Sequence, residues 1–156
     1  MKNLLIIALA GLFILPISAQ SYKGSSQYQS LEEKLNEKYC TGSFKSSNGT
    51  ILNLESENSV SGYFNILTWM QGRVAGFQVY TSRTGVLVPI IRGLVPGIYV
   101  DEIPVNVNYL NTISIQDIAM VKIIKTPFLG GFNGAGGAIA IYTFRGEEDN
   151  DEDNSK

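Results

Sequence analysis

Few residues of this 156-residue chain are of types that could do catalytic chemistry. The chain has no histidine, so the commonest general base and the commonest metal ligand are both absent. This composition excludes a Ser–His–Asp triad, a Cys–His nucleophile pair and most zinc sites. The single cysteine, Cys40, cannot form an intrachain disulfide, and we expect it to be a small buried apolar residue. No metal or cofactor is predicted.

Carboxylates are the remaining candidates for acid–base chemistry. Asp101 and Glu102 are adjacent and Asp117 follows nearby in the sequence, so one hypothesis is a small exported hydrolase that uses these carboxylates. Adjacent residues on a strand point to opposite faces, however, so Asp101 and Glu102 cannot readily share one substrate. The ordinary interpretation is a pair of solvated turn residues, with an ion pair between Arg92 and Asp101 at the strand ends.

A glycine-rich stretch at residues 127–137 could be interpreted as a phosphate site. Gly134 and Gly136 fit two positions of a dinucleotide-binding fingerprint, but the third position falls on Ile139. A strand is expected to follow, so no helix N-terminus is available to hold an anion. We therefore predict a tight turn between two strands, in which the glycines, including Gly137, allow close backbone approach and positive φ.

Three large apolar residues of this stretch are candidates for partner binding: Phe128, Leu129 and Phe132. The two aromatic rings are carried on a flexible glycine frame with few polar neighbours, and exposed aromatic residues are favoured at interfaces. The alternative is that both rings turn inward and complete the core.

The elements around these residues are predicted from the spacing of apolar side chains. β-prone segments at residues 120–125 and 138–144 predict the strands that flank the glycine turn. Apolar residues at helical spacing predict a short helix at residues 65–72, with Trp69 against the core. Further strands are predicted at residues 77–81, 86–91 and 98–100.

The N-terminal part of the exported chain, residues 20–61, is predicted to contain a polar leader, a short helix and a hairpin. Ser30 and Glu33 have the spacing of a capping box before an amphipathic segment. Asn48-Gly49 is a turn signal flanked by β-prone residues, which predicts a hairpin within residues 44–54.

The first nineteen residues have the layout of a secretory signal peptide. Lys2 precedes an apolar run from Leu4 to Leu15, and Ala19 supplies a small residue at the expected cleavage point. The run is shorter than the roughly 20 apolar residues needed to cross a bilayer. We therefore predict that residues 1–19 are removed, that the protein starts at Gln20 in the periplasm or at the outer membrane, and that no spanning segment remains.

Acidic residues are concentrated at the C-terminus. Residues 147–156 hold six of the fourteen acidic residues, whereas residues 20–146 have ten basic and eight acidic residues, a balance of +2. A block of like charge without apolar residues predicts a disordered, solvated tail. The basic residues of the remainder are scattered, so no nucleic-acid partner is predicted.

Five segments between Asn65 and Arg145 carry a family resemblance in their residues and in their order. They are Asn65–Val79, Ile90–Gly93, Ile98–Val105, Ile115–Lys125 and Asn133–Thr143. Together they resemble the plug domain of TonB-dependent outer-membrane receptors, especially the nutrient-uptake branch of the Bacteroidetes. The resemblance implies an α+β fold with a small mixed β-sheet and short helices over residues 62–146.

The resemblance also implies roles for individual residues. The structural motif maps onto Gly72, Gly76, Arg92, Gly93, Asp101, Gly134, Gly136 and Gly137. Arg73 would contact a barrel wall, and a glycine would be usual where this chain has Glu102, so we expect a different local turn there.

In this family the plug is seated inside a 22-stranded barrel, which it blocks. Only eleven residues follow Arg145, so we expect a plug-like domain without its own barrel. The predicted function is a non-enzymatic docking or accessory module of a transport system, with a receptor barrel or another envelope protein as partner. A non-functional remnant of a receptor is the other alternative.

Overall fold

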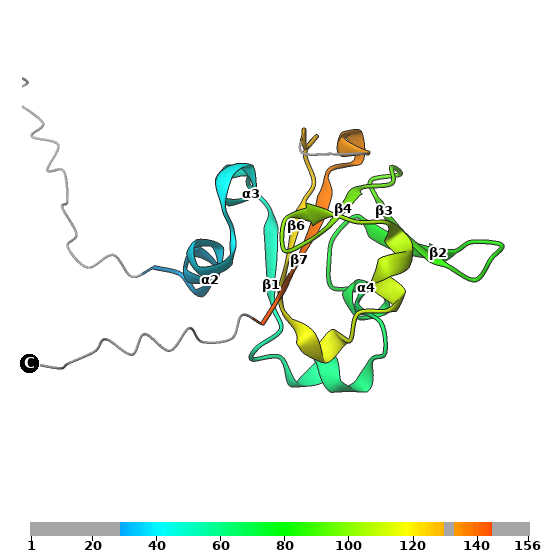
Figure 1. Cartoon of the computed structure of the whole chain (residues 1–156), viewed down its shortest axis with the longest axis horizontal. Helices are drawn as coiled ribbons and strands as arrows, with labels where there is room; N and C mark the ends of the chain where they lie inside the picture. Colours follow the sequence, from blue (N-terminus) through cyan, green and yellow to red (C-terminus); the bar gives the residue numbers. More distant parts are fainter. Residues whose placement is uncertain (1–28, 130–132, 145–156) are drawn as a thin grey trace, which may run out of the picture.

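The computed structural model describes residues 29–129 and 133–144. The predicted signal peptide (1–19), Phe132 and the predicted acidic tail (147–156) lie outside these residues. The described part forms one five-stranded sheet, ordered β1-β6-β7-β4-β5, and a separate two-stranded sheet of β2 and β3 (Figure 1). Short helices accompany both sheets, so the predicted α+β fold is confirmed. Within the described ranges, no helix has the length and apolarity needed to cross a membrane.

The strands and helices are short. The strands are β1 Thr50–Asn53, β2 Phe77–Thr81, β3 Leu87–Ile91, β4 Gly97–Val100, β5 Ile103–Pro104, β6 Ile118–Ile124 and β7 Ala138–Thr143. The α-helices are α2 Leu31–Tyr39, α3 Gly42–Ser46 and α4 Ile66–Met70, and the 3-10 helices are η2 Asn58–Gly62, η3 Val107–Asn111, η4 Ile115–Asp117 and η5 Gly134–Gly136.

β6 and β7 form the centre of the larger sheet. They pair antiparallel, with Val121 opposite Ile141 and Ile123 opposite Ile139, and the glycine-rich turn joins them. On its other side β7 pairs parallel with β4, which makes the sheet mixed. The predicted side-by-side arrangement of the two strands is therefore confirmed.

The small and large residues that alternate along β7 pack into two different cores, one on each face of the sheet. Ile139 and Ile141 face the core that includes α4, whereas Ala138 and Ala140 face the core that includes α2. Successive strand residues point to opposite faces, so a strand covered on both sides needs apolar residues throughout. Figure 1 shows α2 and α3 on one side of the sheet and α4 with β2 and β3 on the other.

The predicted capping box begins α2. Ser30 Oγ accepts a hydrogen bond from the Glu33 N–H at 3.2 Å, and Glu33 Oε2 accepts one from the Ser30 N–H at 2.9 Å. Leu35 and Tyr39 are the buried residues of this helix. The capped helix therefore packs one side onto the sheet.

The predicted hairpin within residues 44–54 is wrong. Residues 42–46 form α3, which buries Phe44, and β1 pairs antiparallel with β6 instead of with a neighbouring strand. Gly49 lies so close to β6 that an added Cβ would be 2.8 Å from the Ile123 carbonyl oxygen. Burial of Phe44 and pairing with a strand far along the chain thus override the local turn signal.

Candidate partner-binding surface

Phe128 lies in the core. Its side chain is 4% exposed, and its ring centroid is 4.6 Å from that of Phe44 and 5.7 Å from that of Tyr99. Phe128 is therefore unavailable to a partner, and the alternative that its ring turns inward is confirmed. The prediction of an exposed ring is wrong because α3 brings Phe44 over this end of the sheet.

Leu129 is the opposite case, since it is fully exposed at 101%. Leu94 and Val95, which precede β4, are also exposed, at 52% and 39%. The close approach of Gly136 to the Val95 carbonyl places both segments at the same end of the sheet, where β4 and β7 begin and β6 ends. We call Leu94, Val95 and Leu129 the apolar end surface.

Tight backbone contacts explain the glycines of the turn. A Cβ on Gly134 would lie 1.9 Å from the Phe128 carbonyl oxygen, and one on Gly136 would lie 2.3 Å from that of Val95. Gly137 has a φ of +83°, and its added Cβ would be 2.1 Å from the Ile124 carbonyl oxygen. These distances are too short for any side chain, so only glycine fits at these three positions beside the backbones of Phe128, Val95 and Ile124.

Arg73 is held by contacts within the domain. Its guanidinium donates to the Trp69 carbonyl at 2.6 Å and to Ser59 Oγ at 3.3 Å. The Arg73 Cζ atom also lies 4.7 Å from the Trp69 ring centroid and 5.4 Å from that of Tyr63. These contacts fix the cation beside two aromatic rings. A role for Arg73 in partner binding stays a prediction.

The four motif residues next to β2 and β3 lie in turns and have positive φ. Gly72 and Gly76 have φ values of +84° and +76°, and Arg92 and Gly93 have values of +51° and +85°. The Arg92 N–H donates to the Gly76 carbonyl at 3.0 Å, which links the two turns at one end of β2 and β3. These residues therefore shape the backbone around the smaller sheet.

The predicted ion pair between Arg92 and Asp101 is wrong. The Asp101 carboxylate instead accepts hydrogen bonds from the Thr143 N–H at 3.0 Å and from Thr143 Oγ1 at 2.8 Å. Lys38–Glu55 is the one ion pair found in residues 29–129 and 133–144. Asp101 thus ties the end of β4 to the end of β7.

Glu102 adopts the positive-φ turn despite carrying a side chain. Asp101 and Glu102 have φ values of +47° and +69°, so the expectation of a different turn is wrong. The Glu102 carboxylate accepts from the Thr41 N–H at 2.6 Å, from the Thr41 hydroxyl, and from the Tyr142 hydroxyl at 3.1 Å. These bonds stabilise the strained turn and join the α2–α3 segment to the sheet.

The geometry gives no support to the hydrolase hypothesis. The carboxylates of Asp101 and Glu102 each accept hydrogen bonds from structural partners on different elements. Nowhere in the described ranges do three or more His, Cys, Asp or Glu residues gather in a way that could hold a metal ion. The carboxylates therefore serve the fold.

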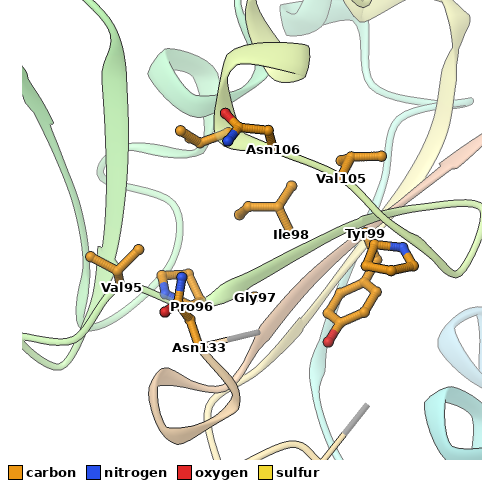
Figure 2. A pocket seen from close by; sticks show the side chains of 10 residues that line it. Val95, Pro96, Gly97, Ile98, Tyr99, Val105, Asn106 and Asn133 are labelled. Carbon is orange, nitrogen blue, oxygen red and sulfur yellow. The ribbon is translucent and has the colours of Figure 1, made fainter. Parts of the chain in front are cut away.

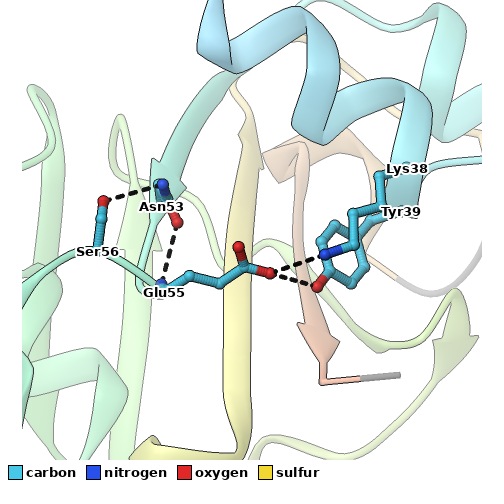
Figure 3. A network of polar contacts seen from close by, with 5 residues as sticks. All are labelled: Lys38, Tyr39, Asn53, Glu55 and Ser56. Atoms are coloured by element: carbon cyan, nitrogen blue, oxygen red, sulfur yellow. Dashed lines mark hydrogen bonds and ion pairs between the residues drawn. The ribbon is translucent and has the colours of Figure 1, made fainter. Parts of the chain in front are cut away.

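A polar network connects α2 to the segment after β1 (Figure 3). Glu55 accepts from the Tyr39 hydroxyl at 2.5 Å and from the Lys38 ammonium at 3.2 Å, and its N–H donates to Asn53. The hydrogen bond from Tyr39 is the main cause that lowers the pKa of Glu55. Burial, together with the bond to Glu55, raises the pKa of Tyr39.

Lys122 is a buried cation that the sequence patterns did not single out. Its side chain is 2% exposed, and its Nζ atom donates to Asn36 Oδ1 and to the Phe44 carbonyl, both at 2.6 Å. Burial lowers the pKa of this ammonium. The sequence did contain a signal for this buried cation, because Lys122 stands in the middle of an otherwise apolar strand, residues 118–124.

A pocket lies beside the apolar end surface, at the open edge of β4 (Figure 2). It has a volume of about 410 Å³. Figure 2 shows Ile98 between Val95 and Val105, with Asn106 on one side and Asn133 on the other. The lining residues are Val95, Pro96, Gly97, Ile98, Tyr99, Pro104, Val105, Asn106, Val107 and Asn133.

Comparisons with known proteins find similarity in solved structures. Protein-family models and curated proteins give no match. The RagAB peptide importer in its 'open-open' state matches with 23% identity and a TM-score of 0.53, over 65% of this chain and 12% of that one. Its 'closed-closed' state matches with 26% identity and a TM-score of 0.52, over 65% and 13%. The ferric citrate transporter FecA in its unliganded form matches with 17% identity and a TM-score of 0.52, over 64% and 18%.

The chain has the plug-like fold of TonB-dependent receptors. It spans at most 18% of the length of the matching chain in these three structures. RagAB is a peptide importer, and FecA is a ferric citrate transporter. The similarity shows the fold, and the Bacteroidetes branch stays a prediction.

Proposed function

We propose that this protein is an exported, non-enzymatic, plug-like domain that acts as a docking or accessory module of an outer-membrane transport system. The observation that carries the proposal is the plug-like fold, shared with RagAB and FecA at TM-scores of 0.53 and 0.52. The signal-peptide layout of residues 1–19, with Lys2 before the apolar run from Leu4 to Leu15, supports export. The partner is a receptor barrel or another envelope protein.

The apolar end surface is the part of the domain that best fits a partner. Leu129 is completely exposed although the residue before it is buried, and Leu94 and Val95 lie at the same end of the sheet. Burying an exposed leucine side chain in an interface contributes about 1.5–3 kcal/mol. The Phe128 N–H donates to the Gly134 carbonyl at 2.7 Å, which anchors the residue before Leu129.

Crosslinking in intact cells tests the proposal. Wild type, Leu129→Asp and Phe64→Asp are compared, because Phe64 is an equally exposed apolar residue, at 100%, on a different segment. We expect the wild type and Phe64→Asp to be crosslinked to the same outer-membrane protein, and Leu129→Asp to lose most of that product. Equal recovery with Leu129→Asp, or no envelope partner for the wild type, would contradict the proposed docking function.

A further inference from the structure

The pocket beside β4 is neutral throughout. None of its ten lining residues is acidic or basic, and the side chains that form most of its wall are Val, Ile and Pro. Its floor is Ile98, which is 6% exposed and belongs to the core next to α4. A cavity of about 410 Å³ is within the range of about 300–1,000 Å³ found for ligand pockets. A charged side chain would enter this pocket without a counter-charge, so a neutral occupant is favoured.

The backbone of β4 adds a directional donor to this neutral pocket. Gly97 and Asp101 donate their N–H groups toward β7, to the carbonyls of Gly137 and Ile141. Because N–H directions alternate along a strand, the Ile98 N–H points to the opposite side, toward β5 and Val105. There Val105 donates to the Ile98 carbonyl at 2.9 Å, but no bond from the Ile98 N–H to the Val105 carbonyl forms.

Strand β5 is too short to cover this edge. It has two residues, which pair with Tyr99 and Val100, and its second residue is Pro104. Val105 makes the last bond to this edge, at the Ile98 carbonyl, so Gly97 at the start of β4 has no partner on this side in the part of the chain that the structure describes. An extended segment bound there can combine a main-chain hydrogen bond with a side-chain pocket, which is how peptides add to sheet edges.

We propose that this pocket binds an extended, neutral segment of the partner protein, with one apolar side chain over Ile98 and one backbone carbonyl accepting from the Ile98 N–H. Leu94 and Val95, which precede β4, continue the apolar contact along the segment. This inference rests on the proposed docking function for the identity of the partner, but its chemistry can be tested on the protein alone.

The test is a titration of the full-length protein, as exported by its host, with a capped neutral peptide, acetyl-Thr-Ala-Val-Ala-Thr-amide. Amide shifts are followed by NMR, and the same peptide with aspartate in place of its valine serves as the matched ligand control. Val95→Asp places a charge at the pocket wall, and Ile103→Asp places one on the same edge outside the lining. Both positions are exposed, so both variants are expected to fold.

We expect the valine peptide to shift the Ile98 amide and to bind about tenfold more weakly to Val95→Asp, while Ile103→Asp stays within about twofold of the wild type. The aspartate peptide is expected to bind at least about tenfold more weakly than the valine peptide. Equal binding of both peptides, no shift at Ile98, or equal effects of the two variants would overturn the inference.

Two further outcomes show whether the pocket inference or the proposed docking function has failed. Failure of the peptide to bind, together with an intact Leu129-dependent crosslink, overturns the pocket inference alone. Peptide binding without any envelope crosslink supports the pocket and contradicts the docking function. Self-association of the protein that Val95→Asp abolishes would assign the pocket to a second copy and overturn the inference.

Discussion

At the scale of single residues, Glu102 shows how a side chain can stabilise a backbone conformation that disfavours it. A left-handed φ at a non-glycine residue costs about 1–2 kcal/mol. Glu102 offsets this cost with hydrogen bonds from Thr41 and Tyr142, and each bond to a charged group contributes about 1.5–3 kcal/mol.

We therefore predict that Glu102→Gly lowers the free energy of unfolding by about 2 kcal/mol or more, since the lost bonds outweigh the relieved strain. Urea denaturation of the two proteins measures the difference. A Glu102→Gly protein more stable than the wild type would show that the strain is the larger effect.

A second prediction at this scale concerns the steric need for glycine in the turn. Gly136→Ala should lower the free energy of unfolding by about 3 kcal/mol or more, because its Cβ would lie 2.3 Å from the Val95 carbonyl oxygen. Gly62→Ala is the control, since no atom lies within 4 Å of its added Cβ. We expect it to be within about 1 kcal/mol of the wild type. Similar losses in both variants, measured by thermal or urea unfolding, would refute the steric explanation.

Lys122 gives a prediction about pH. Burial lowers the pKa of this ammonium below its ordinary value of 10.5. Between the lowered pKa and 10.5 the unfolded state binds more protons than the folded state, so the contribution of Lys122 to stability rises with pH in that window. Below that window the contribution is constant.

Comparison with Lys122→Met isolates this contribution, because the titrations of Tyr39, Tyr99 and Tyr142 are common to both proteins. We expect the variant to be less stable at neutral pH, by about 1–3 kcal/mol, since Asn36 Oδ1 and the Phe44 carbonyl lose their donor. The difference between wild type and variant should widen as the pH approaches 10.5. A difference that stays flat would contradict this account.

At the scale of elements, α2 depends on its cap. The helix has nine residues, too few to be stable alone, and the hydrogen bonds between Ser30 and Glu33 satisfy N–H groups at its first turn. Ser30→Ala is predicted to destabilise it by about 1 kcal/mol. Hydrogen exchange of the amides of residues 31–39 should accelerate by about fivefold, whereas Ser43→Ala, an exposed change in α3, should leave it unaltered. Equal rates in wild type and Ser30→Ala would refute the importance of the cap.

The elements with a clear apolar period could be predicted from the sequence. β6 and β7 followed from β-prone alternation, and α2 followed from the spacing of Ser30 and Glu33. The hairpin within residues 44–54 could not be excluded, because Asn48-Gly49 is a genuine turn signal and the burial of Phe44 depends on residues far along the chain.

The candidate surface was harder to predict than the strands. One loop places Phe128 inside and Leu129 outside, and adjacent apolar residues give no local signal for which of them is buried. The partners of Asp101 and Glu102 depend on where β7 and α3 lie, so their bonds to Thr143 and Thr41 were not visible in the sequence. The neutral pocket is likewise assembled from three separate segments.

At the scale of the whole molecule, one sheet is covered on both faces and has exposed apolar residues at the end near the glycine turn. The α2–α3 segment covers one face, and α4 with the smaller sheet covers the other (Figure 1). The exposed residues at the end near the glycine turn are then the apolar end surface, next to the β4 pocket. In the proposed function, this end is the one that docks.

The most direct test of the central claim is fractionation of the host's cell envelope, with mass spectrometry of the protein's N-terminus and of any crosslinked protein. The account predicts a mature chain beginning at Gln20, recovered with the outer membrane and crosslinked to a transport protein through the surface that contains Leu129. Recovery of the protein from the cytosol with Met1 still in place, and without an envelope partner, would contradict it.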